Sequence, residues 1–145
     1  MKKFLILLVL LLSSFLSYSQ ISELMKNNGI GLTKEQIAKS RNYPCDLYPD
    51  TLNGVEYNVL KCSSSRVLER FFLSNIENKK DTQICFYYRM TLVTGFFPVE
   101  KVENVLDVTF KRQKNHQWLQ KKDSIDIIWT IQQKDYLLIL NAQKQ

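Results

Sequence analysis

The fold is decided by the stretch Gln83-Ile84-Cys85-Phe86-Tyr87-Tyr88-Arg89-Met90-Thr91-Leu92. Two sets of residues alternate along it: the apolar or aromatic set Ile84, Phe86, Tyr88 and Met90, and a second set of mixed polarity, Cys85, Tyr87 and Arg89. A period of two is typical of a strand with one buried and one partly exposed face. The stretch therefore predicts the central strand of a sheet that packs against a second layer.

Four more strands are expected around this one. Val55–Cys62 and Arg66–Ser74 precede it and are joined at residues 63–65 by three serines. A terminal hairpin follows, in which 125–132 alternates with period two and 136–142 returns after a short turn. The segments Cys45–Gly54 and Asn115–Asp123 are expected to be turn or loop, because the first contains Pro49-Asp50 and Asn53-Gly54.

Three helices are expected. Ile21, Leu24 and Met25 have helical spacing before a stop at residues 27–29. Thr33 and Gln36 match a capping box that begins a second, short helix. The longest helix follows Pro98, with a stripe of Val99, Val102, Leu106 and Phe110 and a cationic end at residues 111–114. The order of elements predicts an α+β fold, a two-layer sandwich with an antiparallel sheet of about five strands and helices on one face.

The first 19 residues match a secretory signal peptide. Lys2 and Lys3 precede an unbroken apolar run over residues 4–12, and small Ser17 and Ser19 stand before Gln20. The uncharged run is short for a transmembrane helix, and no later segment approaches that length. We expect removal of residues 1–19, a single domain over 20–145, no transmembrane segment after cleavage, and a periplasmic or secreted location.

The charge balance is modest once the signal peptide is set aside. Residues 20–145 carry 18 basic and 14 acidic side chains. Basic runs at Lys79-Lys80, 111–114 and Lys121-Lys122 would favour nucleic acid in a cytoplasmic protein. Export argues against that partner, so solvated turns explain these runs, with an anionic envelope polymer or membrane surface as the alternative.

Three cysteines, Cys45, Cys62 and Cys85, lie after the signal peptide. An oxidising compartment permits a disulfide, and the odd number leaves one cysteine unpaired or paired between chains. Cys62 and Cys85 are expected at opposite ends of the sheet, too far apart to bond. Cys45–Cys62 is therefore the favoured pair, and Cys85 is expected to be a shielded structural thiol; the alternative is that all three stay reduced.

Catalytic motifs find little support in the sequence. His116 is the single histidine, which is too few for a zinc ligand set, and we expect it in a loop after a helix. Neither a Gly-x-Ser-x-Gly elbow nor a phosphate-binding glycine loop occurs. No cofactor, metal site or catalytic residue is assigned. The alternative is a small secreted enzyme that uses His116 or a cysteine.

Aromatic residues supply the main functional indication. Neighbours on a strand face opposite sides of a sheet, so the pairs Phe71/Phe72 and Phe86/Tyr87 cannot each enter one core. The face away from the helices is expected to carry some of the following, taken as candidate binding residues: Tyr57, Phe71 (or Phe72), Tyr87 and Ile128. Such a face binds a protein partner or stacks on sugars. The alternative is that the N-terminal segment covers it.

A short motif carries one resemblance. Gly31-Leu32-Thr33-Lys34-Glu35-Gln36-Ile37, with Pro44 seven residues later, resembles the opening of small bacterial envelope modules, the outer-membrane-assembly lipoprotein and β-lactamase-inhibitor-protein-like group. The sequence departs from that pattern at Ser40-Arg41-Asn42, where apolar residues and Gly are usual, and it has no lipoprotein cysteine. The resemblance implies a non-catalytic protein-binding module.

Together these patterns predict a non-enzymatic, exported binding or interaction module of the bacterial envelope, of inhibitor or immunity type. The expected ligand is a protein partner or an envelope polymer.

Overall fold

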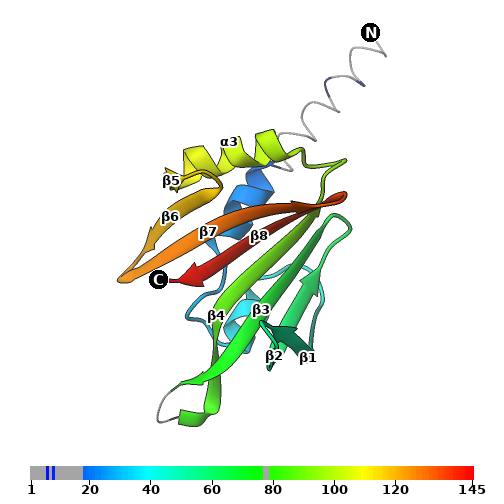
Figure 1. The fold of residues 1–145 in the computed structure, drawn as a ribbon. Helices are drawn as coiled ribbons and strands as arrows, with labels where there is room; N and C mark the ends of the chain where they lie inside the picture. The colour runs from blue at the N-terminus through cyan, green and yellow to red at the C-terminus, as the bar shows by residue number, and fades with distance from the viewer. Residues whose placement is uncertain (1–5, 7, 9–17, 77–78) are drawn as a thin grey trace.

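A computed structural model describes residues 6, 8, 18–76 and 79–145. Over this part of the chain the strands form one antiparallel sheet of eight, in the order β1-β2-β3-β4-β8-β7-β6-β5 (Figure 1). The strands are β1 (Cys45–Leu52), β2 (Val55–Ser63), β3 (Val67–Ile76), β4 (Lys79–Val93), β5 (Lys111–Lys114), β6 (Gln117–Lys122), β7 (Ile125–Lys134) and β8 (Leu137–Lys144). The predicted signal peptide falls almost wholly on residues outside these ranges.

The expected five-stranded α+β sandwich is wrong, because the sheet has eight strands and the fold is mostly β. The first strand that was missed is β1, which the sequence presents as turn because of Pro49 and Asp50. Proline cannot donate to a ladder, so it is tolerated in a strand mainly at a sheet edge. β1 is such an edge strand, since its one partner in the sheet is β2.

The other missed strands are β5 and β6. The long helix ends at Thr109, with Phe110 already extended, so residues 111–114 are a strand and not a cationic helix end. A two-residue turn at Asn115-His116 then leads into β6, with His116 in the left-handed region at φ 58°. The expected loop 115–123 is therefore mostly strand.

The helical segments are residues 18–26, α2 (Lys34–Lys39) and α3 (Val99–Thr109). In α2 the Thr33 side chain accepts from the Gln36 amide while the Gln36 side chain accepts from the Thr33 amide, so the predicted capping box is confirmed. Figure 1 shows residues 18–26 and α2 behind the sheet, with α3 across its upper end. We call the sheet face toward these helical segments the inner face.

The core lies on the inner face. Five successive cross-strand partners from β3 to β6 form a row of fully buried side chains: Phe71, Tyr88, Ala142, Trp129 and Trp118. Ile21, Met25, Ile37, Val102 and Leu106 from the helical segments belong to the same cluster. Burial of this apolar surface is the main force that holds the helices to the sheet.

One disulfide joins the first two strands. Cys45 and Cys62 are register partners with Cα atoms 4.1 Å apart, and their sulfurs are bonded. Cys85 is a buried free thiol on β4. The predicted pairing is thus confirmed, although Cys45 begins a strand and does not lie in a loop.

Candidate functional site

The face of the sheet opposite the helices, which we call the outer face, is turned toward the viewer in Figure 1. Its middle row consists of five cross-strand partners, Lys61, Arg70, Arg89, Asn141 and Thr130. All five are partly exposed. The side chains that residues 18–26 bury, such as Ile21 and Met25, are in the inner core, so the described N-terminal segment does not cover the outer face.

A β-bulge concentrates aromatic rings on this face. Phe72 pairs with Tyr87 and Leu73 pairs with Cys85, so Phe86 is the extra residue in β4. A bulge interrupts the alternation of faces. Phe86 and Tyr87 consequently lie on the same side of the sheet, against the expectation from strict alternation.

Four outer-face rings contact one another and form what we call the aromatic cluster: Tyr57, Phe72, Phe86 and Tyr87. Ring centroids are 5.0 Å apart for Tyr57–Phe86, 5.4 Å for Phe72–Tyr87 and 6.5 Å for Tyr57–Phe72. Phe72 is fully buried beneath its neighbours, while the other three rings are half-buried. The cluster is therefore partly exposed, with Tyr57, Phe86 and Tyr87 at its surface and Phe72 beneath them.

The predicted binding residues are divided by the structure. Tyr57 and Tyr87 lie in the aromatic cluster, and Ile128 lies on the same face two strands from Tyr87, linked through Gln143. Phe71 lies on the opposite face, fully buried in the core, where its ring contacts Tyr88. Phe72 takes the outer position because Phe71, and not Phe72, pairs in the inner row.

Arg89 is held in place beside the aromatic cluster. Its Nε donates to Asn141 Oδ1 at 2.9 Å and its Nη2 donates to Tyr87 Oη at 3.3 Å. Tyr87 Oη in turn donates to the same Asn141 oxygen at 2.6 Å. The guanidinium also lies over the rings of Phe72 and Tyr87, 6.0 and 5.7 Å from their centroids. Arg89 is thus positioned by neutral partners.

Cations occupy adjacent places across the outer face, because Lys61 pairs with Arg70 and Arg70 with Arg89. Like charges directly opposite one another destabilise a sheet. Arg70 has a partial counter-charge in Asp50, at 3.5 Å. Neither Lys61 nor Arg89 has a carboxylate within 4.0 Å in the described part of the chain. The sequence analysis does not identify this row. Arg70 is two residues before Phe72, and Arg89 is two residues after Tyr87, and both of those aromatic residues were considered for the outer face.

A shallow groove of about 360 Å³ runs beside these cations. Its apolar part comes from outer-face side chains of β3, β4 and β8, namely Leu68, Val93, Leu137 and Ile139. Arg70 and Arg89 line one end, and Ser64 and Ser65 lie at the β2–β3 turn. The groove therefore has an apolar floor, with Arg70 and Arg89 at one end and Arg66 beside the serines of the β2–β3 turn.

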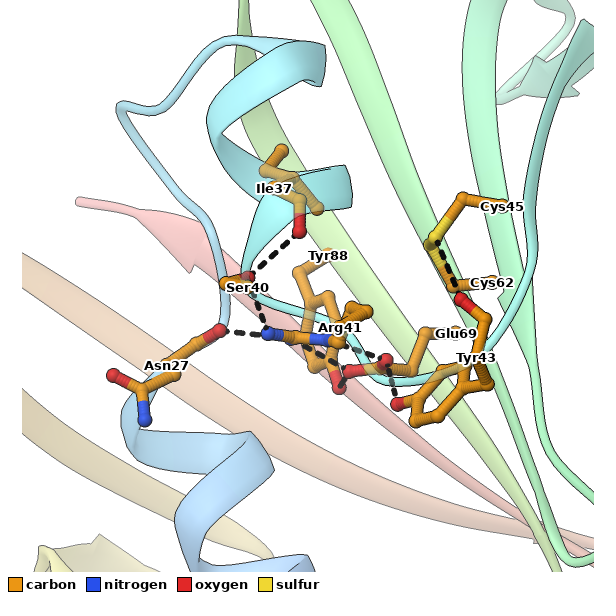
Figure 2. Close-up of a disulfide and its surroundings, with 9 residues drawn as sticks. All are labelled: Asn27, Ile37, Ser40, Arg41, Tyr43, Cys45, Cys62, Glu69 and Tyr88. Atoms are coloured by element: carbon orange, nitrogen blue, oxygen red, sulfur yellow. Dashed lines mark hydrogen bonds and ion pairs between the residues drawn. A yellow bond between two sulfur atoms is a disulfide. The ribbon is translucent and has the colours of Figure 1, made fainter.

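A second polar constellation lies on the inner face, next to the disulfide (Figure 2). Glu69 and Arg41 form a fully buried ion pair, with Nε–Oε2 at 2.7 Å and Nη2–Oε1 at 2.9 Å. Tyr88 Oη donates to Glu69 at 2.6 Å, and Tyr43 Oη donates to the other carboxylate oxygen. Arg41 also donates to the Asn27 carbonyl at 2.8 Å and to Ser40 Oγ at 2.9 Å. We call these residues the Glu69 cluster.

The surroundings within the Glu69 cluster keep Tyr43 and Tyr88 neutral and Arg41 charged. Burial raises the pKa of both Tyr43 and Tyr88, and the Glu69 charge raises them further. Burial acts to lower the pKa of Arg41, but the hydrogen bond and charge of Glu69 outweigh it and the pKa rises. Both phenols therefore stay neutral donors to the Glu69 carboxylate. The cluster ties the segment after α2 to β3 and β4, which is a structural role.

A cavity of about 580 Å³ lies beside this cluster, between residues 20–27, the segment after α2 and the β2–β3 turn. Arg41 and Tyr43 line it, yet their printed hydrogen bonds run to Glu69 and its neighbours. In the described residues no buried side-chain polar atom lacks a partner.

The structure places His116 and Cys85, the two groups considered for the enzyme alternative, on different elements. His116 is exposed in the β5–β6 turn, where Nδ1 lies 2.7 Å from Glu103 Oε1 of α3. Cys85 is buried on β4, and burial raises the pKa of its thiol to about 12. A thiol with that pKa is protonated at neutral pH and is a poor nucleophile. Neither side chain lines the 580 Å³ cavity or the outer-face groove.

The described residues contain no cluster of three or more His, Cys, Asp or Glu side chains that would hold a metal ion. Within the same ranges, no helix has the length and apolar character needed to cross a membrane. No protein-family model, curated protein or solved structure matches the chain.

Proposed function

We propose that this protein is a non-catalytic, exported binding module that contacts a protein partner through the outer face of its sheet. The observation that carries the proposal is the outer face itself, where the aromatic cluster, the positioned Arg89 and the groove are contiguous on β2, β3, β4 and β8. Tyrosine and arginine are the residue types that contribute most to protein interfaces.

The size of the face suits such a contact. A standard interface buries about 800 Å² on each partner. Strands lie about 4.8 Å apart, so the eight strands span roughly 35 Å across. Partly exposed polar and aromatic side chains lie next to one another on this face, and non-obligate interfaces have such a mixed composition.

Export is the second part of the proposal. The basic start, short apolar run and small residues before Gln20 support it, as does the Cys45–Cys62 disulfide, since disulfides persist in oxidising compartments. The resemblance of residues 31–44 to envelope modules points the same way. Intact mass of the secreted protein tests it: a chain beginning at Gln20 is expected, and secreted material that keeps residues 1–19 would refute the cleavage.

The partner contact is tested by comparing variants in capture from envelope and culture fractions. Tyr57→Ser combined with Phe86→Ser removes two half-buried rings of the aromatic cluster. Val108→Ser is the matched control, because Val108 is 89% exposed on α3 and lies outside the sheet. A protein captured by wild type and Val108→Ser but lost by the double variant supports the proposal. Capture that is equal for all three contradicts it.

A further inference from the structure

The outer face contains an arginine, Arg89, that has no carboxylate within 4.0 Å among the described residues. Arg89 is partly buried, and its two hydrogen-bond partners, Asn141 and Tyr87, are neutral. A guanidinium has five N–H donors, of which these bonds use two. The other three N–H donors of Arg89 have no hydrogen-bond acceptor among the described residues. A held guanidinium with spare donors is the usual arrangement for recognising a carboxylate in a bidentate manner.

Arg70 strengthens the attraction for an anion at this place. It lies directly opposite Arg89 in the register, and its ion pair with Asp50 at 3.5 Å is partly exposed and therefore weak. The two side chains together line the same end of the groove. Placing two cations opposite each other costs stability in the free protein, and a bound carboxylate would relieve that repulsion.

The rest of the groove selects the neighbouring part of the ligand. Leu68, Val93, Leu137 and Ile139 are aliphatic, and the β2–β3 turn adds the hydroxyls of two serines and the exposed Arg66 side chain. Aliphatic side chains pack well on such a floor, whereas sugars require many hydrogen-bonding groups or a flat ring. The groove of about 360 Å³ is at the small end of ligand sites, so it suits a few residues of a chain.

We infer that this groove binds an acidic peptide segment of the protein partner, with a glutamate or aspartate carboxylate on Arg89 and Arg70 and a neighbouring aliphatic side chain on the groove floor. The inference rests on the proposed function and names the chemistry of its partner. It requires no movement of the strands, because Asn141 and Tyr87 already hold the Arg89 guanidinium.

The test uses two blocked hexapeptides, one with a central glutamate flanked by leucines and one with glutamine in its place. Binding to the full protein is followed by NMR, on the Arg89 Nε–H and on the backbone amides of Thr91 and Ile139. The glutamate peptide is expected to bind about tenfold more tightly than the glutamine peptide. Arg89→Gln is expected to remove that difference.

Controls separate a local site from general charge. Lys101→Gln removes one positive charge from an exposed position on α3 and is expected to leave the preference for glutamate unchanged. Arg70→Gln is the second site variant, for use if Arg89→Gln does not fold, and it is expected to weaken the preference in part. Equal binding of the two peptides, no binding of either, or an equal loss with Lys101→Gln would overturn the inference.

Other ligands are distinguished in the same assay. Polygalacturonate and dodecanoate carry carboxylates on a sugar chain and on an alkyl chain. If either binds in an Arg89-dependent way while the glutamate peptide does not, the inference is wrong. If capture of a partner depends on Tyr57 and Phe86 but not on Arg89, the proposed function stands and the acidic-peptide chemistry fails.

Discussion

Arg41 and Glu69 form a bidentate ion pair in the interior, with side chains 2% and 0% exposed and N–O distances of 2.7 and 2.9 Å. The pair joins the segment after α2 to β3 near the start of that strand. The two Glu69 oxygens also accept from Tyr43 and Tyr88, and Arg41 donates further to Ser40 and Asn27, so neither charge is left without a partner.

Glu69→Gln is expected to lower the free energy of unfolding by about 3–5 kcal/mol, because it leaves the Arg41 charge buried without compensation. Glu35→Gln, at an exposed pair with Lys34, is the control and should leave the denaturation midpoint unchanged. The double variant Arg41→Met/Glu69→Leu should be less destabilised than Glu69→Gln. Urea denaturation measures all three; equal midpoints for Glu69→Gln and Glu35→Gln would contradict the role of the pair.

Gly29→Ala is expected to destabilise by about 1–3 kcal/mol or more. Gly29 has φ 76°, and an added Cβ would lie 3.0 Å from the Phe71 ring. Gly54→Ala is the matched control, since φ is 80° there with no atom within 4 Å. The difference between the two variants in thermal midpoint measures the steric contact alone, and no difference would mean that the Phe71 contact is easily relieved.

Leu106→Ala and Ile127→Ala should each cost about 2–5 kcal/mol, as large-to-small changes in a core do. Leu106 is 1% exposed on α3 and Ile127 is 0% exposed on β7. Val108→Ala, two residues from Leu106 on the same helix, should cost little, because Val108 is 89% exposed. Chemical denaturation would refute the packing of α3 if Leu106→Ala and Val108→Ala gave the same midpoint.

The cysteines should show three distinct labelling states with iodoacetamide. The native protein at pH 8 is expected to take no label, because Cys85 is buried and the pKa of its thiol is raised to about 12. Denaturant alone should expose one thiol, and denaturant with reductant all three. Mass spectrometry counts the labels. A label on the native chain would show that Cys85 is accessible.

The disulfide should stabilise the fold by about 3 kcal/mol on the chain-entropy model, given a sequence separation of 17. Cys45→Ala/Cys62→Ala tests this by urea denaturation against wild type. The urea midpoint of the wild type in reductant should approach that of the double variant. An unchanged midpoint would mean that the β1–β2 ladder alone holds this edge of the sheet.

Stability should fall at alkaline pH. Burial raises the pKa of Cys85 above 9.0 and of Tyr43 and Tyr88 above 10.0. Each group then binds its proton more tightly in the folded state, so its contribution is complete below the ordinary pKa and is lost as pH rises through the folded pKa. Denaturation midpoints between pH 8 and 12 measure the decline. Tyr88→Phe should make it shallower, and a pH-independent midpoint would contradict the burial of these groups.

Local patterns in the sequence were sufficient for features that depend on neighbouring residues. The capping box at Thr33 and Gln36 and the buried helical positions Val102 and Leu106 form as predicted. The alternation predicted for 83–92 holds from Tyr87 to Leu92 and is broken before that by the bulge at Phe86. The pairing of Cys45 with Cys62 was also predictable, since strand lengths exclude Cys62–Cys85. Periodicity, capping and chain length act over a few residues, so a single sequence is enough to reveal them.

Only the tertiary structure decided the features that depend on which strands meet. Proline in β1 is tolerated because that strand is at an edge, and edge position is a property of the whole sheet. The bulge that places Phe86 beside Tyr87, the placement of Phe71 on the inner face and Phe72 on the outer face, and the opposition of Arg70 and Arg89 all follow from the β3–β4 register. That register is set by the packing of the inner face, where a shift of one residue would turn the core side chains outward. The outer face is therefore a consequence of long-range packing, which local sequence does not encode.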